Sequence, residues 1–141
     1  MMKCVFKCRP ALSLSLAAFL LMLSACAATL PKEQLVEQRA TARWDAFLAG
    51  DMAGSYEYFS PGFRSSVSLM QYQRSVFLNK VSWTGAEFVE SNCTETTCKV
   101  KISLNYTVVG AVPGLKSFSS KQAVEESWVL VDGNWYMVPK I

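Results

Sequence analysis

The charged side chains of this sequence offer few groups suited to catalysis. Histidine is absent, and it is the side chain most often used for proton transfer near neutral pH and the commonest nitrogen ligand of transition metals. Among the carboxylates, Glu126 shares the parity of an expected strand with Val124 and Trp128. It either points inward, where desolvation would suit it to acid–base chemistry, or lies at the rim of the sheet beside a lysine. We expect the rim placement, so no catalytic residue is assigned and Glu126 is the single candidate.

Aromatic residues give a stronger indication of a binding site. Tyrosine and tryptophan combine a large apolar body with a polar tip, which suits them to a pocket for an apolar or aromatic ligand. The candidates for such a pocket are Tyr56, Tyr106 and Trp128, and most other aromatic residues are expected in the core. No P-loop, G-x-S-x-G or HExxH motif is present. We therefore expect no cofactor and no metal, and we favour a role without catalysis.

The first 25 residues have the layout of a secretory signal. Lys3, Lys7 and Arg9 form a basic head, and the apolar run over residues 11–23 follows it. This run is shorter than the ~20 apolar residues that span a bilayer. The three basic residues account for the formal net charge of +3. The rest of the chain is thus formally neutral, and no basic face for nucleic acid is expected.

The segment from Leu23 to Cys26, with the sequence LSAC, resembles the lipobox of bacterial lipoproteins. The resemblance implies that residues 1–25 are removed, that Cys26 is acylated, and that residues 26–31 form a lipidated tether. The protein would then face the periplasm from a membrane. The outer membrane is favoured because Ala27, and not an aspartate, follows the cysteine. The alternative is a retained membrane anchor with an incidental cysteine.

Cys93 and Cys98 are the two cysteines that remain after the signal segment and Cys26. In an oxidising compartment a pair of thiols is normally bridged, which predicts a structural disulfide. A ring this small stabilises by only ~2 kcal/mol, so the bridge would fix one turn and not the whole domain. Two free buried thiols, or a redox pair without the C-x-x-C spacing, are the alternatives.

Residues 32–141 suit a single domain in which helices precede strands. Helical spacing of apolar residues, capping residues and Gly or Pro stop signals predict helices over residues 32–48, 52–59 and 68–78. Alternating patterns predict strands over 86–92, 99–108, 122–131 and 134–138, with a long connection over 110–120. The Asp132-Gly133 pair suits a hairpin turn. The fold class is therefore α+β, with three N-terminal helices packed on a curved antiparallel sheet of about four strands.

A set of motifs over residues 32–140 resembles the nuclear transport factor 2-like superfamily, a cone-shaped fold that includes ketosteroid isomerase and polyketide cyclases. The motifs are Arg43-Trp44, Gly50-Asp51, Tyr56, Tyr58, Ser60-Pro61, Arg64, Trp128 and the segment 132–136. The resemblance implies a sheet that curls around the helices and leaves a pocket, which some relatives use for catalysis and others for a partner. No catalytic residue of the superfamily can be carried over to this sequence.

Together these patterns predict a membrane-anchored periplasmic lipoprotein whose domain is a non-catalytic binding or assembly module with an envelope protein as partner. The alternative is a small apolar-ligand binding protein, or an isomerase-like or cyclase-like enzyme, that uses the aromatic cavity. An inward carboxylate in an open pocket would favour the alternative. A filled cone with an apolar patch outside would favour the assembly module.

Overall fold

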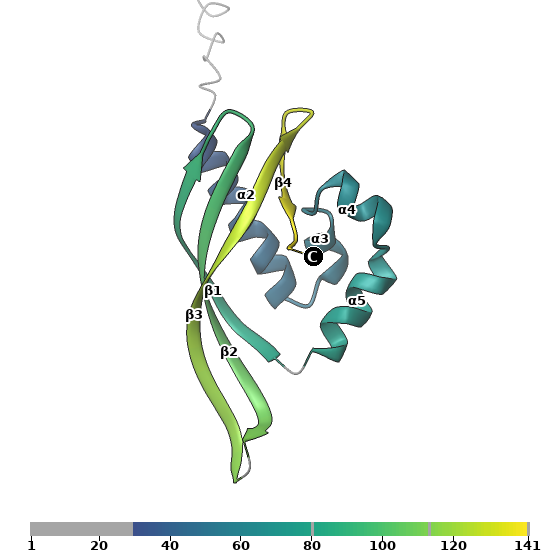
Figure 1. Ribbon diagram of the computed structural model, residues 1–141, viewed down its shortest axis with the longest axis vertical. Helices are drawn as coiled ribbons and strands as arrows, with labels where there is room; N and C mark the ends of the chain where they lie inside the picture. The colour runs from purple at the N-terminus through teal and green to yellow at the C-terminus, as the bar shows by residue number, and fades with distance from the viewer. Residues whose placement is uncertain (1–29, 80, 113, 141) are drawn as a thin grey trace, which may run out of the picture.

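Four helices precede four strands in the computed structural model, which describes residues 30–79, 81–112 and 114–140 (Figure 1). The helices are α2 (Lys32–Leu48), α3 (Met52–Tyr56), α4 (Pro61–Ser66) and α5 (Leu69–Leu78). The strands are β1 (Val81–Cys93), β2 (Thr97–Val112), β3 (Leu115–Val131) and β4 (Asn134–Val138). They form one antiparallel sheet in the order β1-β2-β3-β4. The predicted α+β class with four antiparallel strands is confirmed.

Helix α2 lies across the inner face of the sheet, where it packs on β1, β2 and β4 (Figure 1). Its buried side chains recur at steps of three and four residues, as the face of an amphipathic helix requires: Val36, Ala40, Arg43 and Trp44. The helix ends before Gly50, whose φ of +81° is the left-handed conformation that favours glycine. Among the helices that the structure describes, none is both long enough and apolar enough to cross a bilayer.

The three remaining helices form a group beside α2, and each begins with a side-chain cap. Asp51 accepts a hydrogen bond from the Gly54 amide, Ser60 accepts one from the Phe63 amide, and Ser68 forms the expected capping box with Gln71. The expectation of three helices is wrong, because Ser60-Pro61 begins α4 and does not merely end the helix before it. Proline is well tolerated at the first helical position, where its missing N–H would have no partner.

The sheet is longer than the sequence predicts. β1 begins at Val81, five residues before the expected strand, and two register shifts, between Trp83 and Gly85 and between Phe88 and Glu90, interrupt its pairing with β2. Such shifts bend and twist a strand, which curves this part of the sheet. At the other end of the sheet, Asp132 and Gly133 both have positive φ, as a two-residue hairpin turn of the predicted type requires.

The expected long connection over residues 110–120 is instead part of a hairpin. β2 and β3 stay paired as far as Val112 and Leu115, and this end of the hairpin projects beyond the helices (Figure 1). Gly114, with a φ of +87°, supplies a conformation suited to the tight turn. The two glycines of this segment, Gly110 and Gly114, therefore mark one irregularity in the pairing and one turn.

Two buried clusters hold the helices against the sheet. The larger one joins α2 to the inner face of the sheet, and the smaller one joins Tyr56, Phe59 and Tyr72 within the helical group. Phe47 and Met137 pack against both clusters. The two are also tied by main chain, because the Ser60 amide donates to the Met137 carbonyl and the Met137 amide donates to the Tyr58 carbonyl. This bridge fixes the helical group beside β4.

Candidate functional site

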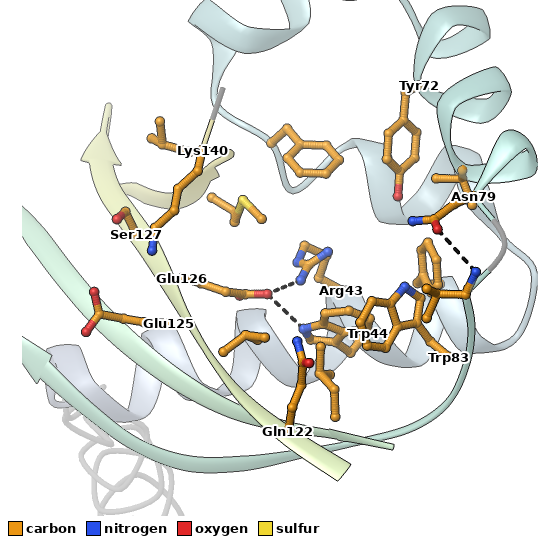
Figure 2. Close-up of a pocket in the computed structure, with 18 residues that line it drawn as sticks. Arg43, Trp44, Tyr72, Asn79, Trp83, Gln122, Glu125, Glu126, Ser127 and Lys140 are labelled. Atoms are coloured by element: carbon orange, nitrogen blue, oxygen red, sulfur yellow. Dashed lines mark hydrogen bonds and ion pairs between the residues drawn. The ribbon is translucent and has the colours of Figure 1, made fainter. Parts of the chain in front are cut away.

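A pocket of about 390 Å³ lies between the helices α2 and α5 and the inner face of the sheet (Figure 2). Most of its lining is apolar: Trp44, Phe47, Phe59, Val76, Val81, Trp83, Leu104, Val124, Met137 and Val138. The polar lining residues are Arg43, Tyr72, Asn79, Gln122, Glu125, Glu126, Ser127 and Lys140. A largely apolar cavity of this size with a few polar groups is typical of small-molecule sites.

Glu126 lies inside this site and not at the rim of the sheet. Glu126 is 6% exposed, and its carboxylate is directed toward Arg43 and Trp44 of α2 (Figure 2). The expectation of a rim position beside a lysine is wrong. The neighbouring strand residue, Glu125, is the one that points outward to a lysine, Lys99, at 3.4 Å.

The carboxylate of Glu126 accepts three hydrogen bonds from buried side chains. Its Oε1 atom accepts from Nη2 of Arg43 and, at 2.9 Å, from the indole N–H of Trp44. Its Oε2 atom accepts from the indole N–H of Trp128 at 3.0 Å. Three donors, one of them positively charged, compensate the loss of water around this buried carboxylate. This arrangement holds Glu126 in an ion pair with Arg43.

Arg43 was named from the sequence only in the Arg43-Trp44 motif, and no role in a site was expected of it. It is 3% exposed, and its guanidinium lies over the rings of Trp44 and Phe59, at 4.5 and 5.8 Å from their centroids. The sequence contains a signal for this position, since residue 43 falls in the apolar stripe of its helix, between Ala40 and Phe47. An arginine in such a stripe needs a buried anion, and Glu126 supplies it.

Tyr72 of α5 brings a second polar group to the pocket. Burial raises the pKa of its phenol, and this effect outweighs a hydrogen bond with Ser55 and the positive charge of Arg43, which both lower it. The hydroxyl oxygen is 3.4 Å from Oγ of Ser55. Figure 2 shows the Tyr72 hydroxyl directed from α5 toward the centre of the lining residues.

None of the three aromatic residues predicted for a pocket is among the residues that line this one. The hydroxyl of Tyr56 donates to the carbonyl of Val67 at 2.7 Å, in the helical cluster. Tyr106 packs edge to face on Trp83, with ring centroids 5.7 Å apart, and so supports a lining residue from behind. Trp128 is fully buried and reaches the site only through its hydrogen bond to Glu126. Strand parity does not indicate how deep in the core a side chain lies.

Cys93 and Cys98 form a disulfide at the β1–β2 turn, with their Cα atoms 4.0 Å apart. Cys98 is buried in the larger cluster, so the bridge ties the turn to the core. Cys26 and residues 1–25 lie outside the described residues, and their lipidation and removal stay predictions, as does the periplasmic location. In the part of the chain that the structure describes, no group of three or more candidate ligand side chains could hold a metal ion.

Among the solved structures that resemble this fold are two SEC-C motif containing proteins. The one from Rhodopseudomonas palustris is 12% identical with a TM-score of 0.53, and the match covers 69% of this chain and 70% of that one. The one from Psychrobacter arcticus is 12% identical with a TM-score of 0.56, and the match covers 79% of this chain and 63% of that one, less than two thirds of its length. Neither a protein-family model nor a curated protein matches this sequence. At these identities the likeness concerns the fold alone.

These matches overturn the resemblance drawn from the sequence. The chain was expected to be a bacterial lipoprotein with a nuclear transport factor 2-like domain, whereas the two matching structures described above are SEC-C motif containing proteins. They support neither a nuclear transport factor 2-like cone nor a lipoprotein. The motifs behind the expectation were helix ends and aromatic positions, and many α+β domains need such residues for capping and core packing alone.

Proposed function

We propose that this domain is a non-catalytic binding module whose pocket holds a small, mostly apolar ligand. The observation that carries the proposal is the pocket of about 390 Å³ between α2, α5 and the sheet, with its largely apolar lining. Exposed polar residues, among them Asn79, Gln122 and Lys140, contribute to the same lining and mark where the pocket meets solvent. The proposal keeps the binding role predicted from the sequence and makes a small molecule the partner.

The state of Glu126 supports binding over catalysis. A general base must have a free lone pair within reach of the proton that it removes. Hydrogen bonds from Arg43, Trp44 and Trp128 already occupy three of the about four acceptor sites of Glu126. Removing any of these donors to free the carboxylate would leave a buried charge poorly compensated. We therefore assign Glu126 to the structure of the pocket wall.

Tryptophan side chains give a direct test of ligand binding. Trp44 and Trp83 line the pocket, and Trp135 lies in the core outside it. In a two-dimensional ¹H–¹⁵N spectrum of the full chain, titration with 2-ethylnaphthalene should shift the indole N–H signals of Trp44 and Trp83. The signal of Trp135 should stay in place. Absence of any shift at Trp44 and Trp83, up to the solubility limit of the probe, would contradict the proposal.

A pair of variants on α5 separates the pocket from the surface of the same helix. Val76 lines the pocket, and Leu78, two residues further on, is 68% exposed. Val76→Phe places a larger side chain in the cavity and should abolish the shifts, because the cavity volume is lost. Leu78→Phe adds a ring outside the pocket and should leave them unchanged. Equal responses of the two variants would show that the probe binds elsewhere.

A further inference from the structure

We infer that the ligand of this pocket carries an uncharged oxygen acceptor, a carbonyl group, and that Arg43 and Tyr72 donate hydrogen bonds to it. The inference rests on the proposed function and names the chemical class of the ligand. It follows from two donors of the pocket that the described residues satisfy only in part: the guanidinium of Arg43 and the hydroxyl of Tyr72.

Arg43 has more donors than the protein uses. A guanidinium group carries five N–H bonds. Among the described residues, Glu126 takes a hydrogen bond from Nη2, and Nε is buried with no acceptor at all. Figure 2 shows the guanidinium at the centre of the lining residues, with only one of its nitrogens joined to Glu126. A buried donor without an acceptor is costly, which indicates that a bound molecule completes this group.

Tyr72 supplies a second donor from the opposite wall. Its only hydrogen-bond partner among the described side chains is the Ser55 hydroxyl, at 3.4 Å, which is long for a bond between two hydroxyl groups. Because burial raises its pKa, the phenol keeps its proton at neutral pH. An oxygen placed between α2 and α5 would accept from both residues.

The charges of the pocket favour an uncharged acceptor over an anion. Arg43 and Glu126 neutralise each other, whereas Glu125 points outward to Lys99 and Lys140 is exposed, so neither of these two adds a buried charge. A carboxylate on the ligand would therefore add a buried negative charge without a counter-ion of its own. A carbonyl oxygen accepts the same hydrogen bonds without that cost.

Three naphthalene probes that differ in one substituent test the inference on the full chain. 2-Acetylnaphthalene has a carbonyl where 2-ethylnaphthalene has a methylene, and 2-naphthoate has a carboxylate. Dissociation constants come from the indole shifts of Trp44 and Trp83. We expect 2-acetylnaphthalene to bind about tenfold more tightly than 2-ethylnaphthalene, as a hydrogen bond to a charged donor predicts. 2-Naphthoate should bind more weakly than 2-acetylnaphthalene.

Two variants locate the hydrogen bonds. Arg43→Lys keeps the positive charge opposite Glu126 but removes the planar set of donors. Tyr72→Phe removes one hydroxyl group. Each should reduce the preference for 2-acetylnaphthalene over 2-ethylnaphthalene, and Tyr106→Phe, outside the pocket lining, should not. If Arg43→Lys fails to fold, the affinities of the wild type for the three probes and the effect of Tyr72→Phe still test the inference.

The outcomes separate this inference from the proposed function. Equal affinities for 2-acetylnaphthalene and 2-ethylnaphthalene would overturn the inference that the ligand carries a carbonyl group. The proposal of an apolar binding pocket would stand. Tighter binding of 2-naphthoate than of 2-acetylnaphthalene would overturn an uncharged ligand. A preference that survives both Arg43→Lys and Tyr72→Phe would overturn the assigned donors. Failure of all three probes to bind would overturn the proposed function and this inference with it.

Discussion

The two faces of the sheet use the same kind of ion pair in opposite surroundings. The inner face, under α2, buries Val100, Ile102 and Leu104 and holds the single pair Arg43–Glu126, whose side chains are 4% and 5% exposed. The outer face carries Lys101–Glu90, Lys121–Glu87 and Lys99–Glu125, all of whose side chains are about half exposed or more. Alternation along the strands produces both faces from one sequence.

The difference teaches that an ion pair matters here through what surrounds it. In water each partner of an outer pair is solvated whether or not the other is present, so the pair adds little. Inside the domain neither partner has water as a substitute, so removal of one leaves the other uncompensated. The inner pair is therefore needed for the stability of this wall of the pocket, and the outer pairs contribute little to stability.

Removal of the inner cation should have the largest effect. Arg43→Met leaves the Glu126 carboxylate buried beside two indole groups and should lower the free energy of unfolding by about 3–5 kcal/mol. Urea denaturation followed by circular dichroism measures this loss. The double variant Arg43→Met with Glu126→Gln removes the stranded charge, keeps an acceptor for one of the two indoles, and should recover part of the stability. A loss under about 1 kcal/mol for Arg43→Met would make the inner pair equivalent to a surface pair.

Reduction of the disulfide should have an intermediate effect. The ring between Cys93 and Cys98 is short, so the constraint on the unfolded chain is worth only about 2 kcal/mol. Urea unfolding with and without dithiothreitol measures this difference. A variant with both cysteines replaced by alanine serves as control, because dithiothreitol should not alter its midpoint. A loss as large as that of Arg43→Met would mean that this turn, and not the inner pair, governs stability.

Tyr72 should make the domain sensitive to alkaline pH. Burial raises the pKa of its phenol above the ordinary value of 10.0, so its contribution to stability is complete below that pH. The contribution is then lost as the pH rises through the raised pKa. Urea midpoints between neutral pH and about pH 11 should fall more steeply for the wild type than for Tyr72→Phe. Tyr106→Phe is the matched control, and its urea midpoint should fall with pH as steeply as that of the wild type. If the midpoint of Tyr106→Phe falls as little as that of Tyr72→Phe, the pH sensitivity does not come from Tyr72.

The smallest effect is expected on the outer face. The hydrogen bond and charge of Lys121 lower the pKa of the Glu87 carboxyl, so this pair contributes fully above the ordinary pKa of a glutamate. The contribution is lost as the pH falls from there through the lowered pKa. Lys121→Gln should return the pKa of Glu87 toward its ordinary value in an NMR titration. The urea midpoint at neutral pH should hardly change. A large shift of that midpoint would contradict the expectation that the ion pairs of the outer face contribute less to stability than the inner pair.

Local signals in the sequence predicted the helix ends and the hairpin turn well. The apolar steps of α2, the Ser68–Gln71 capping box and the Asp132-Gly133 turn each depend on neighbours within a few residues, and all three are present. Ser60-Pro61 gave the wrong number of helices, because the same two residues can follow one helix and begin the next. The hairpin over residues 110–120 was missed because pairing with a distant strand outweighs local breakers.

The site was less predictable because it depends on residues far apart in the sequence. Glu126 is a weak candidate until Arg43, 83 residues away, is placed against it. The alternation along the strand allowed Glu126 to point inward, which it does. It gave no measure of how deep a side chain lies, so Trp128 was expected in the pocket although it lies behind the pocket wall. An arginine in an apolar helical stripe, together with a glutamate of inward parity, was the one pairing that the sequence could have supported.

The bridge between the 58–60 segment and β4 sets limits on how this pocket can be redesigned. Its two main-chain hydrogen bonds enclose Phe59 and Met137, which both line the cavity. At that point the separation of the walls is determined by peptide groups, so no choice of side chains there will bring the walls apart. On the α5 side, which Val76 lines, the width of the pocket depends on side-chain size. Engineered changes in the range of accepted molecules should therefore begin from α5.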